Sequence, residues 1–279
     1  MRADLHSHST ASDGLASPAR LVELAAELGL THLALTDHDT TSGLAAAREQ
    51  GGRSGVSVVD GIEITTELNG RELHLVGLLI DPEAPPMVAF VARAGAERAS
   101  RMERMVEALS RSGVGVRMED VLAEAAGATL ARPHLARALV RSGAATSFND
   151  AFDRFLGPGR PGHVLRWKPS VGEVVSLVRA AGGTTSVAHP GVDRVSRREL
   201  EDLAAAGVDA VEARHPEHPP TQVAAYERWA AALGLAVTGG SDFHGADRTP
   251  ERSPGCSLTP AGMLERLAAT AAGRARAGS

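Results

Sequence analysis

The sequence predicts an α/β fold in which a largely parallel sheet closes into a barrel. Short β-rich segments alternate with amphipathic helical segments over most of the 279 residues, and one β-hairpin interrupts this alternation. The number of strand–helix units favours a closed barrel, and an open, doubly wound sheet is the alternative. A hydrophobic share of 43% is enough for a substantial core in a chain of this length.

The first two strand–helix units occupy the N-terminal part of the chain. Residues 2–8 are predicted to form a short strand. Ser17 and Pro18 then carry the signals of a helix start, and Gly29 carries the signal of its end. The stretch THLALTDHD at 31–39 predicts a second buried strand, which is followed by a helix containing GLAAAREQGG.

A β-hairpin is predicted where two β-rich runs flank Asn69-Gly70, the strongest short signal for a hairpin turn. A turn at these residues fixes the pairing of the strands: Leu68 faces Arg71, Thr65 faces His74 and Glu63 faces Val76. Glu63 and His74 are then diagonal neighbours on one face of the hairpin. We therefore expect the two side chains to reach a common ion.

The strand signals stop between about residues 83 and 160, where one long helix and several short helices are predicted. We expect residues 83–160 to form a helical insertion domain that covers the mouth of the barrel. The barrel is then discontinuous and comprises residues 1–82 and 161–273. Strand–helix alternation resumes after the insertion, with helices predicted around 171–181, 196–206 and 219–233. Residues 274–279 are expected to be a disordered tail.

Composition excludes several classes of protein. A formal net charge of -5 argues against a protein that coats nucleic acid, and no stable DNA partner is expected. Cys256 is the only cysteine, so no intrachain disulfide can form, and a reducing cytoplasm is predicted. No apolar stretch reaches the roughly 20 residues of a membrane helix, and no N-terminal segment resembles a secretion signal. We therefore expect no membrane association.

Histidines and carboxylates recur where the predicted strands end. In parallel α/β folds the carboxyl ends of the strands meet on one side, and reactive residues gather there. The residues at these ends are His6, His8, Asp13, Asp37, His38, Glu63, His74, His189, His215, Asp242 and His244. Taken singly, most have an ordinary explanation as a cap or a buried imidazole, but their shared position favours a functional cluster. His32 begins its strand, at the opposite end, and is expected to be structural, whereas His163 and His218 are left open.

The donor set of this cluster predicts a metal centre. Imidazole and carboxylate suit zinc, manganese or iron, and the absence of thiolates argues against a purely structural zinc site. The ligands outnumber those that one tetrahedral ion can use, so we expect two or three ions with Glu63 or Asp242 as a bridge. Two neighbouring ions can activate water and clamp a phosphoryl group during in-line displacement.

Six motifs together resemble the PHP (polymerase and histidinol phosphatase) superfamily of metal-dependent phosphoesterases, and they span nearly the whole chain. The motifs are DLHSHSTASDG, LALTDHD, GIEI, ELHLVGL, AHPG and TGGSDFHG. The helical insertion, which contains ARPHLARALV, resembles the branch of RNase AM and the 3′,5′-nucleoside bisphosphate phosphatases. The resemblance implies a distorted (β/α)₇ TIM-like PHP barrel with a trinuclear metal site.

The resemblance also implies a set of ligands for divalent ions, with Mn²⁺ preferred and Zn²⁺ or Fe²⁺ as alternatives. One ion would be held by His6, His8, Glu63 and Asp242. A second would share Glu63 and add His74 and His189, and the third would take Asp13, His38 and His244. Asp37 would orient a ligand or lie at the edge of the site.

The implied activity is hydrolysis of phosphate esters of nucleotides by a metal-activated hydroxide. The enzyme would be a 3′,5′-nucleoside bisphosphate 3′-phosphatase, a 5′-to-3′ exonuclease on short RNA, or both. The candidate catalytic residues are His215 and Asp37, and a metal-bound water is the alternative to His215 as general acid. The candidate phosphate-binding residues are Arg132, His134, Arg166, Lys168 and His215. Of these, Arg132 and His134 are predicted to begin a helix, where backbone N–H groups favour a phosphate.

Three other interpretations remain open at this point. A phosphatase of the histidinol-phosphate type would act on a small metabolite, but the helical insertion disfavours it. A non-catalytic, metal-stabilised PHP module would serve a protein partner, but no polymerase-like region is attached. A metal-dependent amidohydrolase ranks last, because no lysine is positioned to form a carbamylated bridge between ions.

Overall fold

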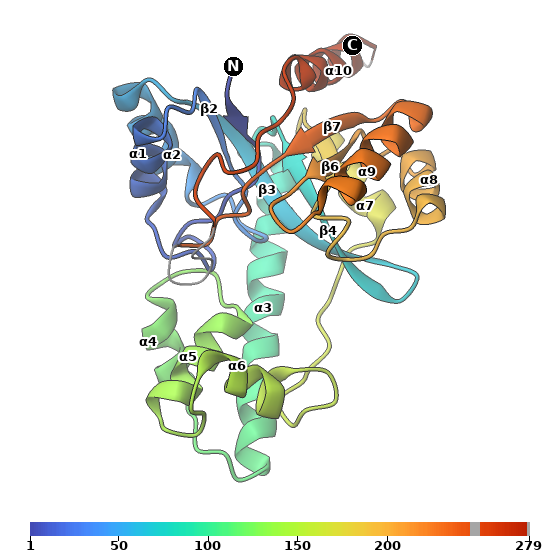
Figure 1. Ribbon diagram of the computed structural model, residues 1–279. Helices are drawn as coiled ribbons and strands as arrows, with labels where there is room; N and C mark the ends of the chain where they lie inside the picture. Colours follow the sequence, from blue (N-terminus) through green and yellow to red (C-terminus); the bar gives the residue numbers. More distant parts are fainter. Residues whose placement is uncertain (246–251, 278–279) are drawn as a thin grey trace. The chain divides into compact units, whose positions relative to one another are not determined.

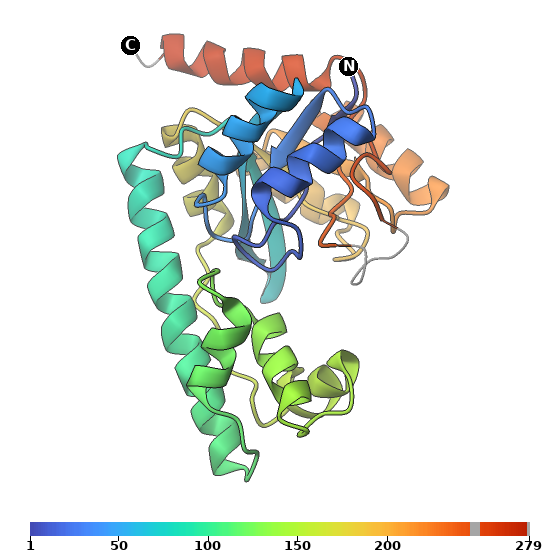
Figure 2. The ribbon, with the colours of Figure 1, turned by 90° about the vertical axis from the view of Figure 1, so that its left-hand side faces the viewer.

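The chain divides into two compact units in the computed structural model, which describes residues 1–245 and 252–277 (Figures 1 and 2). One unit comprises Met1–Phe90 and Lys168–Ser279, and the other comprises Val91–Trp167. The first unit carries all of the strands among the described residues and is called here the barrel unit. The second consists of helices and is called the helical unit.

The barrel unit is built on a seven-stranded sheet whose strands are neighbours in the order in which they occur in the chain. The strands are β1 (Ala3–Asp4), β2 (His32–Leu35), β3 (Ser57–Leu68), β4 (Arg71–Leu78), β5 (Thr184–Val187), β6 (Ala210–Arg214) and β7 (Ala236–Gly239). Only β4 runs antiparallel to its neighbours. The helices of this unit are α1 (Pro18–Glu27), α2 (Leu44–Ser54), α7 (Val171–Ala180), α8 (Arg197–Ala205), α9 (Pro220–Leu233) and α10 (Met263–Ala277).

The first and last strands approach each other and nearly close the sheet. The Leu5 N–H donates to the Gly239 carbonyl oxygen at 3.1 Å, and the Asp242 N–H donates to the His6 carbonyl oxygen at 2.9 Å. These bonds join the residues just after β1 to the last residue of β7 and to the segment that follows it. Regular pairing of β1 therefore ends at Asp4, although a strand was predicted over 2–8. The contact confirms the predicted barrel and disfavours the open sheet.

The predicted hairpin is confirmed residue by residue. Leu68 pairs with Arg71, Thr65 with His74 and Glu63 with Val76. Asn69 and Gly70 have φ values of 53° and 76°, which is the left-handed conformation that a two-residue hairpin turn requires. The register of β3 and β4 thus follows from the turn alone.

Small residues fill the amino-terminal end of the barrel, and α10 closes this end. Ala3, Ala34, Ala210 and Ala236 are buried there together with Leu5, Val59 and Leu78. Leu264 and Leu267 of α10 pack onto this cluster. Because this end is filled and capped, the opposite, carboxyl end is left for polar residues.

The last helix is longer than predicted. Residues 274–279 were expected to be disordered, but α10 continues to Ala277. The Arg274 guanidinium pairs with both carboxylate oxygens of Asp209, which ties the last turn of α10 to the start of β6. Residues 278–279 lie outside the part that the structure describes.

The helical unit has a core of its own. Its elements are α3 (Pro85–Arg111), which begins in the barrel unit, α4 (Met118–Ala125), α5 (Arg132–Arg141), α6 (Phe148–Ala151) and the π-helix η1 (Phe152–Leu156). Met105, Leu109, Leu135 and Leu139 are fully buried at its centre. The unit extends beyond residue 160, where the insertion was expected to end, because the following segment packs on α3: Arg101 Nε donates to the Val164 carbonyl oxygen at 2.8 Å. Coverage of the barrel mouth by this unit stays a prediction.

Neither unit contains a membrane-spanning segment within residues 1–245 and 252–277. The helices there lack the combination of length and apolar character that crossing a bilayer demands.

Candidate metal centre

Residues from six places along the chain meet at one end of the barrel, on the side where its parallel strands have their carboxyl ends. They are the nine predicted metal ligands: His6, His8 and Asp13 after β1, His38 after β2, Glu63 in β3, His74 in β4, His189 after β5, and Asp242 and His244 after β7. Each has a ligand atom within 3.6 Å of a ligand atom of another member. The structure therefore brings together all nine of the predicted metal ligands.

Glu63 lies at the centre of this cluster, and its side chain is 1% exposed. Its Oε1 atom lies 3.0 Å from His74 Nδ1 and 3.1 Å from His189 Nε2. Its Oε2 atom lies 3.0 Å from His38 Nδ1, 3.2 Å from His8 Nε2 and 3.3 Å from His6 Nε2. One carboxylate thus faces five imidazoles with both of its oxygens, which is the arrangement of a bridging ligand.

Asp242 faces two of the same imidazoles, those of His6 and His8. Its Oδ1 atom lies 3.3 Å from His8 Nε2 and 3.6 Å from His6 Nε2. The backbone of Asp242 has a φ of 47°, a conformation that is strained for a residue other than glycine. Arg252 supports it, because Nη1 donates to the Asp242 carbonyl oxygen at 3.1 Å and to Oδ2 at 2.8 Å.

Gly240 allows the chain before Asp242 to reach this position. A Cβ atom at Gly240 would lie 2.3 Å from the Cβ of His6 and 2.8 Å from Glu212 Oε1. Real Cβ atoms essentially never come so close to other atoms. Gly240 is therefore needed for the close approach of the segment after β7 to His6.

The ligand atoms fall into three overlapping groups in which every pair lies within 4.8 Å. The groups are His8, Asp13, His38 and His244; His6, His8 and Glu63; and His38, Glu63 and His74. They differ from the ligand sets that the resemblance implies, since His8 and His38 each belong to two groups. Within the first group, Asp13 Oδ1 lies 3.3 Å from His244 Nε2.

The residues of the cluster fit divalent cations. His6 Nε2 and His8 Nε2 lie 3.1 Å apart, and both face the carboxylates of Glu63 and Asp242. Because His6 Nδ1 is bonded to Glu212, a neutral His6 ring directs the lone pair of Nε2 at these oxygens. His38 Nδ1 is buried beside Glu63 yet has no hydrogen-bond partner among the residues described. Lone pairs that face carboxylate oxygens in a buried site need a shared cation between them.

The charges of the cluster lead to the same conclusion. Burial alone would raise the pKa of Glu63, but the imidazoles of His38, His74 and His6 outweigh it and hold this pKa well below its ordinary value. Burial alone would lower the pKa of His8, but Asp242 and Glu63 raise it to about 9. The acids therefore remain ionised and draw positive charge into the site, either as protons or as metal ions.

Asp37 supports the loop that joins His8 to Asp13. Its Oδ1 atom accepts hydrogen bonds from the Ser9 N–H at 2.8 Å and the Ser12 hydroxyl at 2.6 Å, and its Oδ2 atom accepts from the Ser9 hydroxyl at 2.7 Å. The side chain is buried beneath that loop. This geometry is that of a residue which positions ligands.

His215, the candidate general acid, lies beside Asp242. Its Nε2 atom is 3.4 Å from Asp242 Oδ2, and its Nδ1 atom accepts a hydrogen bond from the Glu217 N–H at 3.2 Å. An imidazole nitrogen that accepts a hydrogen bond carries no proton, so the network assigns the proton of neutral His215 to Nε2. His215 is thus arranged to donate a hydrogen bond at the edge of the cluster.

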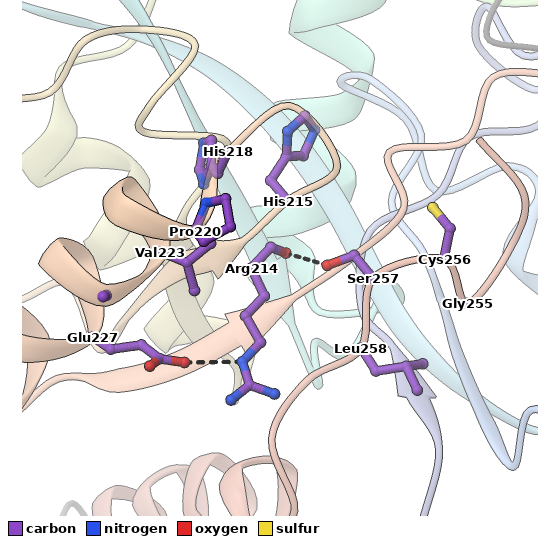
Figure 3. A pocket seen from close by; sticks show the side chains of 11 residues that line it. Arg214, His215, His218, Pro220, Val223, Glu227, Gly255, Cys256, Ser257 and Leu258 are labelled. Atoms are coloured by element: carbon purple, nitrogen blue, oxygen red, sulfur yellow. Dashed lines mark hydrogen bonds and ion pairs between the residues drawn. The ribbon is translucent and has the colours of Figure 1, made fainter. Parts of the chain in front are cut away.

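A cavity of about 570 Å³ adjoins the other side of His215 (Figure 3). Its lining includes Arg214, Cys256 and His218, and Arg214 is held by Glu227 at 2.9 Å. His218 donates from Nδ1 to the Ala213 carbonyl oxygen and accepts at Nε2 from the Gly191 N–H, both at 2.9 Å. Both of its ring nitrogens are used within the fold, so His218 is a structural residue.

The other candidate phosphate-binding residues are divided between the two units. Lys168 belongs to the barrel unit, and its Nζ atom lies 3.4 Å from Glu67 Oε2 and 3.9 Å from Glu72 Oε2. Arg132, His134 and Arg166 belong to the helical unit. Arg132 begins α5 as predicted, and His134 Nδ1 accepts a hydrogen bond from the Ala131 N–H at 3.1 Å and so caps this helix.

Two residues of the site were missed in the sequence. Glu212 is a buried residue of β6, and its carboxylate contacts His6 and the backbone N–H of His189. The signal for it was a single carboxylate in the otherwise apolar stretch VDAVEA. Arg252 contacts Asp242 from a loop after β7, and neither spacing nor periodicity pointed to it.

The chain is similar to known proteins over most of its length. A model of the PHP domain family matches residues 4–119. The 5′-3′ exoribonuclease Rnm of Escherichia coli (strain K12) is 37% identical over 247 residues, which are 86% of this chain and 84% of the relative. The 3′,5′-nucleoside bisphosphate phosphatase of Chromobacterium violaceum is 33% identical over 246 residues, 86% of either chain. A solved structure of a metal-dependent phosphoesterase from Bifidobacterium adolescentis matches with a TM-score of 0.86 and 34% identity, and covers 95% of this chain and 94% of that one.

Proposed function

The chain belongs to the PHP family of metal-dependent phosphoesterases, and from that premise we propose that it removes phosphate from nucleotides at the candidate metal centre. The protein is an enzyme that hydrolyses phosphate esters. The observation that carries the assignment of the site is the central position of Glu63, whose two carboxylate oxygens face five imidazoles.

We propose a cluster of three divalent ions, with Mn²⁺ preferred over Zn²⁺ and Fe²⁺. The donor set supports this, because it combines imidazoles with carboxylates and contains no thiolate. Glu63 would be shared between ions, with His6, His8 and Asp242 on one side, His74 and His189 on another, and Asp13, His38 and His244 around the third. Bound divalent ions would supply an activated water and neutralise charge on the phosphoryl oxygens.

The chain's own residues have separate tasks in this proposal. Asp37 holds the loop between His8 and Asp13. His215 presents its Nε2 proton beside Asp242, where it donates a hydrogen bond to a phosphoryl or leaving oxygen. Arg252 holds the carboxylate and the backbone of Asp242 in place.

The proposed substrates are nucleoside 3′,5′-bisphosphates and short RNA with a 5′-phosphate. The names of the two relatives support this class, since one is an exoribonuclease and the other a bisphosphate phosphatase. Arg132 at the start of α5 and Lys168 are the proposed phosphate contacts. The single cysteine supports a reducing compartment, and the cytoplasm is the proposed location.

Phosphate release with added Mn²⁺ tests the proposal, on a panel of nucleoside 3′,5′-bisphosphate, short 5′-phosphorylated RNA and histidinol phosphate. We expect turnover of the first two substrates and its loss in EDTA. His8→Ala should abolish release, whereas His32→Ala should not, because His32 lies at the start of β2, away from the cluster. Preference for histidinol phosphate would favour the small-metabolite alternative. Metal uptake without release from any substrate would favour a non-catalytic module.

A further inference from the structure

Glu212 is a buried carboxylate of β6 that no ligand set includes. Its side chain is 3% exposed, and both of its oxygens lie 3.1 Å from His6 Nδ1. Oε2 also accepts a hydrogen bond from the backbone N–H of His189 at 2.7 Å. One carboxylate from β6 therefore contacts two proposed ligands, one after β1 and the other after β5.

The contact with His6 determines which nitrogen faces the cluster. A carboxylate can only accept hydrogen bonds, so Glu212 holds the proton of His6 on Nδ1. The lone pair of Nε2 is then directed at Glu63 and Asp242, where a cation would lie. A carboxylate behind a ligand histidine also makes the ring a stronger electron donor.

The contact with His189 acts on the backbone. His189 has a φ of 27°, a strained value for a residue other than glycine. Its N–H is fixed by Glu212, and its Nε2 atom lies 3.1 Å from Glu63 Oε1. Glu212 thus positions two histidines that lie on either side of the Glu63 carboxylate: His6 beside Oε2 and His189 beside Oε1.

We infer that Glu212 is a positioning residue that raises the affinity of the cluster for divalent cations, by fixing the His6 ring and the His189 backbone together and by adding a buried negative charge. The inference rests on the proposed metal centre. Mutation of a residue that hydrogen-bonds to a metal-ligating histidine typically lowers metal affinity about 10- to 100-fold. We expect a loss of this size when Glu212 is changed.

Glu212→Gln separates this role from simple space filling. The variant keeps the shape of the side chain, and its single oxygen can occupy the position of Oε2, where it still accepts from the His189 N–H. Its amide N–H₂ then takes the place of Oε1, so a donor replaces one of the two acceptors that lie 3.1 Å from His6 Nδ1. The variant therefore loses the negative charge and holds the proton of His6 on Nδ1 less firmly, which weakens the alignment of the Nε2 lone pair with the cluster. Glu201→Gln is the matched control, because Glu201 on α8 is a partly exposed carboxylate paired with Arg197.

Binding of Mn²⁺ to the metal-free proteins, followed by the EPR signal of free Mn²⁺, tests the inference without any assay of turnover. We expect Glu212→Gln to weaken Mn²⁺ binding about 10- to 100-fold, and Glu201→Gln to leave it unchanged. In a His6→Ala background, the same change at Glu212 should have a smaller effect on Mn²⁺ affinity, since the ring that it orients is absent and only the loss of the charge remains. Glu212→Asp, which is too short to hold both partners, should also weaken binding and serves if Glu212→Gln does not fold.

Two failures are distinguishable in this experiment. A wild-type protein that takes up no Mn²⁺ would overturn the metal centre and the inference with it. Uptake by the wild type together with equal affinity in Glu212→Gln and Glu201→Gln would overturn the role of Glu212 alone. An undiminished effect of Glu212→Gln in the His6→Ala background would show that Glu212 does not act through His6.

Discussion

His74 Nδ1 lies 3.0 Å from Glu63 Oε1, although the two residues are not opposite each other in the hairpin. Glu63 pairs with Val76 and His74 pairs with Thr65, so the contact runs diagonally across the two strands. A turn of two residues sets this register, and a slip by one residue would turn one of the two side chains to the other face. The turn at Asn69-Gly70, which lies outside the cluster, thus determines that Glu63 and His74 share one face of the hairpin.

Glu63→Gln is expected to remove most of the metal and to reduce phosphate release by at least about 100-fold, because even the partners of ligands cost up to that factor. The change replaces a charged bridge by a neutral amide with one acceptor oxygen. Metal content after dialysis and phosphate release should fall together. Glu201→Gln on α8 is the control, since Glu201 is partly exposed and pairs with Arg197. Full metal content in Glu63→Gln would contradict the bridging role.

Asp37→Ala is expected to destabilise the metal-free protein by about 1–3 kcal/mol, because it leaves buried donors of Ser9 and Ser12 without their acceptor. Thermal unfolding in EDTA measures this effect. The Mn²⁺ stoichiometry should also decrease, since the loop that carries Asp13 loses its support. If Asp37 instead took part only in catalysis, turnover would fall while unfolding and metal stoichiometry stayed at wild-type values.

Substitutions at His215 distinguish a hydrogen-bond donor from a general acid. The amide N–H₂ of Gln can stand where His215 Nε2 stands but cannot transfer a proton. We therefore expect His215→Gln to retain much more activity than His215→Ala, with kcat less than about 100-fold below wild type. A general acid contributes about 10²–10⁴-fold, so equal losses in both variants within that range would favour proton transfer by His215.

Glu199, in the first turn of α8, is expected to make a contribution to the free energy of unfolding that depends on pH. Ser196 caps the helix and donates to Glu199 Oε2 from its backbone N–H at 2.8 Å, and Arg71 pairs with the same carboxylate. The hydrogen bonds from Ser196 and the charge of Arg71 lower the pKa of Glu199 to about 2. A depressed pKa means that this contribution is full above about pH 4.5, the ordinary value, and is lost as the pH falls toward 2.

Glu199→Gln keeps a side chain that suits the capping box, so it removes mainly the charge. We expect its unfolding midpoint in EDTA to lie below that of the wild type by a constant amount between pH 5 and 8. The difference between the two midpoints should become smaller below pH 4.5, where the stabilisation from the ionised Glu199 carboxylate begins to be lost. A gap that persists unchanged at low pH would show that shape, rather than charge, gives Glu199 its effect.

Local signals predicted most of the fold and the set of residues in the cluster. The Asn69-Gly70 turn determined the hairpin register, and the repeated delivery of histidines and acids at strand ends located the site. What was missed depends on tertiary contacts. β1 stops at Asp4 because the chain beyond it pairs with the segment after β7, and α10 continues because Arg274 finds Asp209. Glu212 and Arg252 act through partners far away in the sequence, and no local pattern reports such partners.

The bonds between the segments after β1 and β7 also bear on the order of events during translation. His6 is synthesised long before Asp242 and His244, because more than 230 residues separate them in the sequence. Until then Asp242 and His244 are missing from the proposed ligand set, so the full cluster cannot form on the emerging polypeptide. Full loading with metal becomes a late event, and a chain released before residue 244 would carry no complete centre.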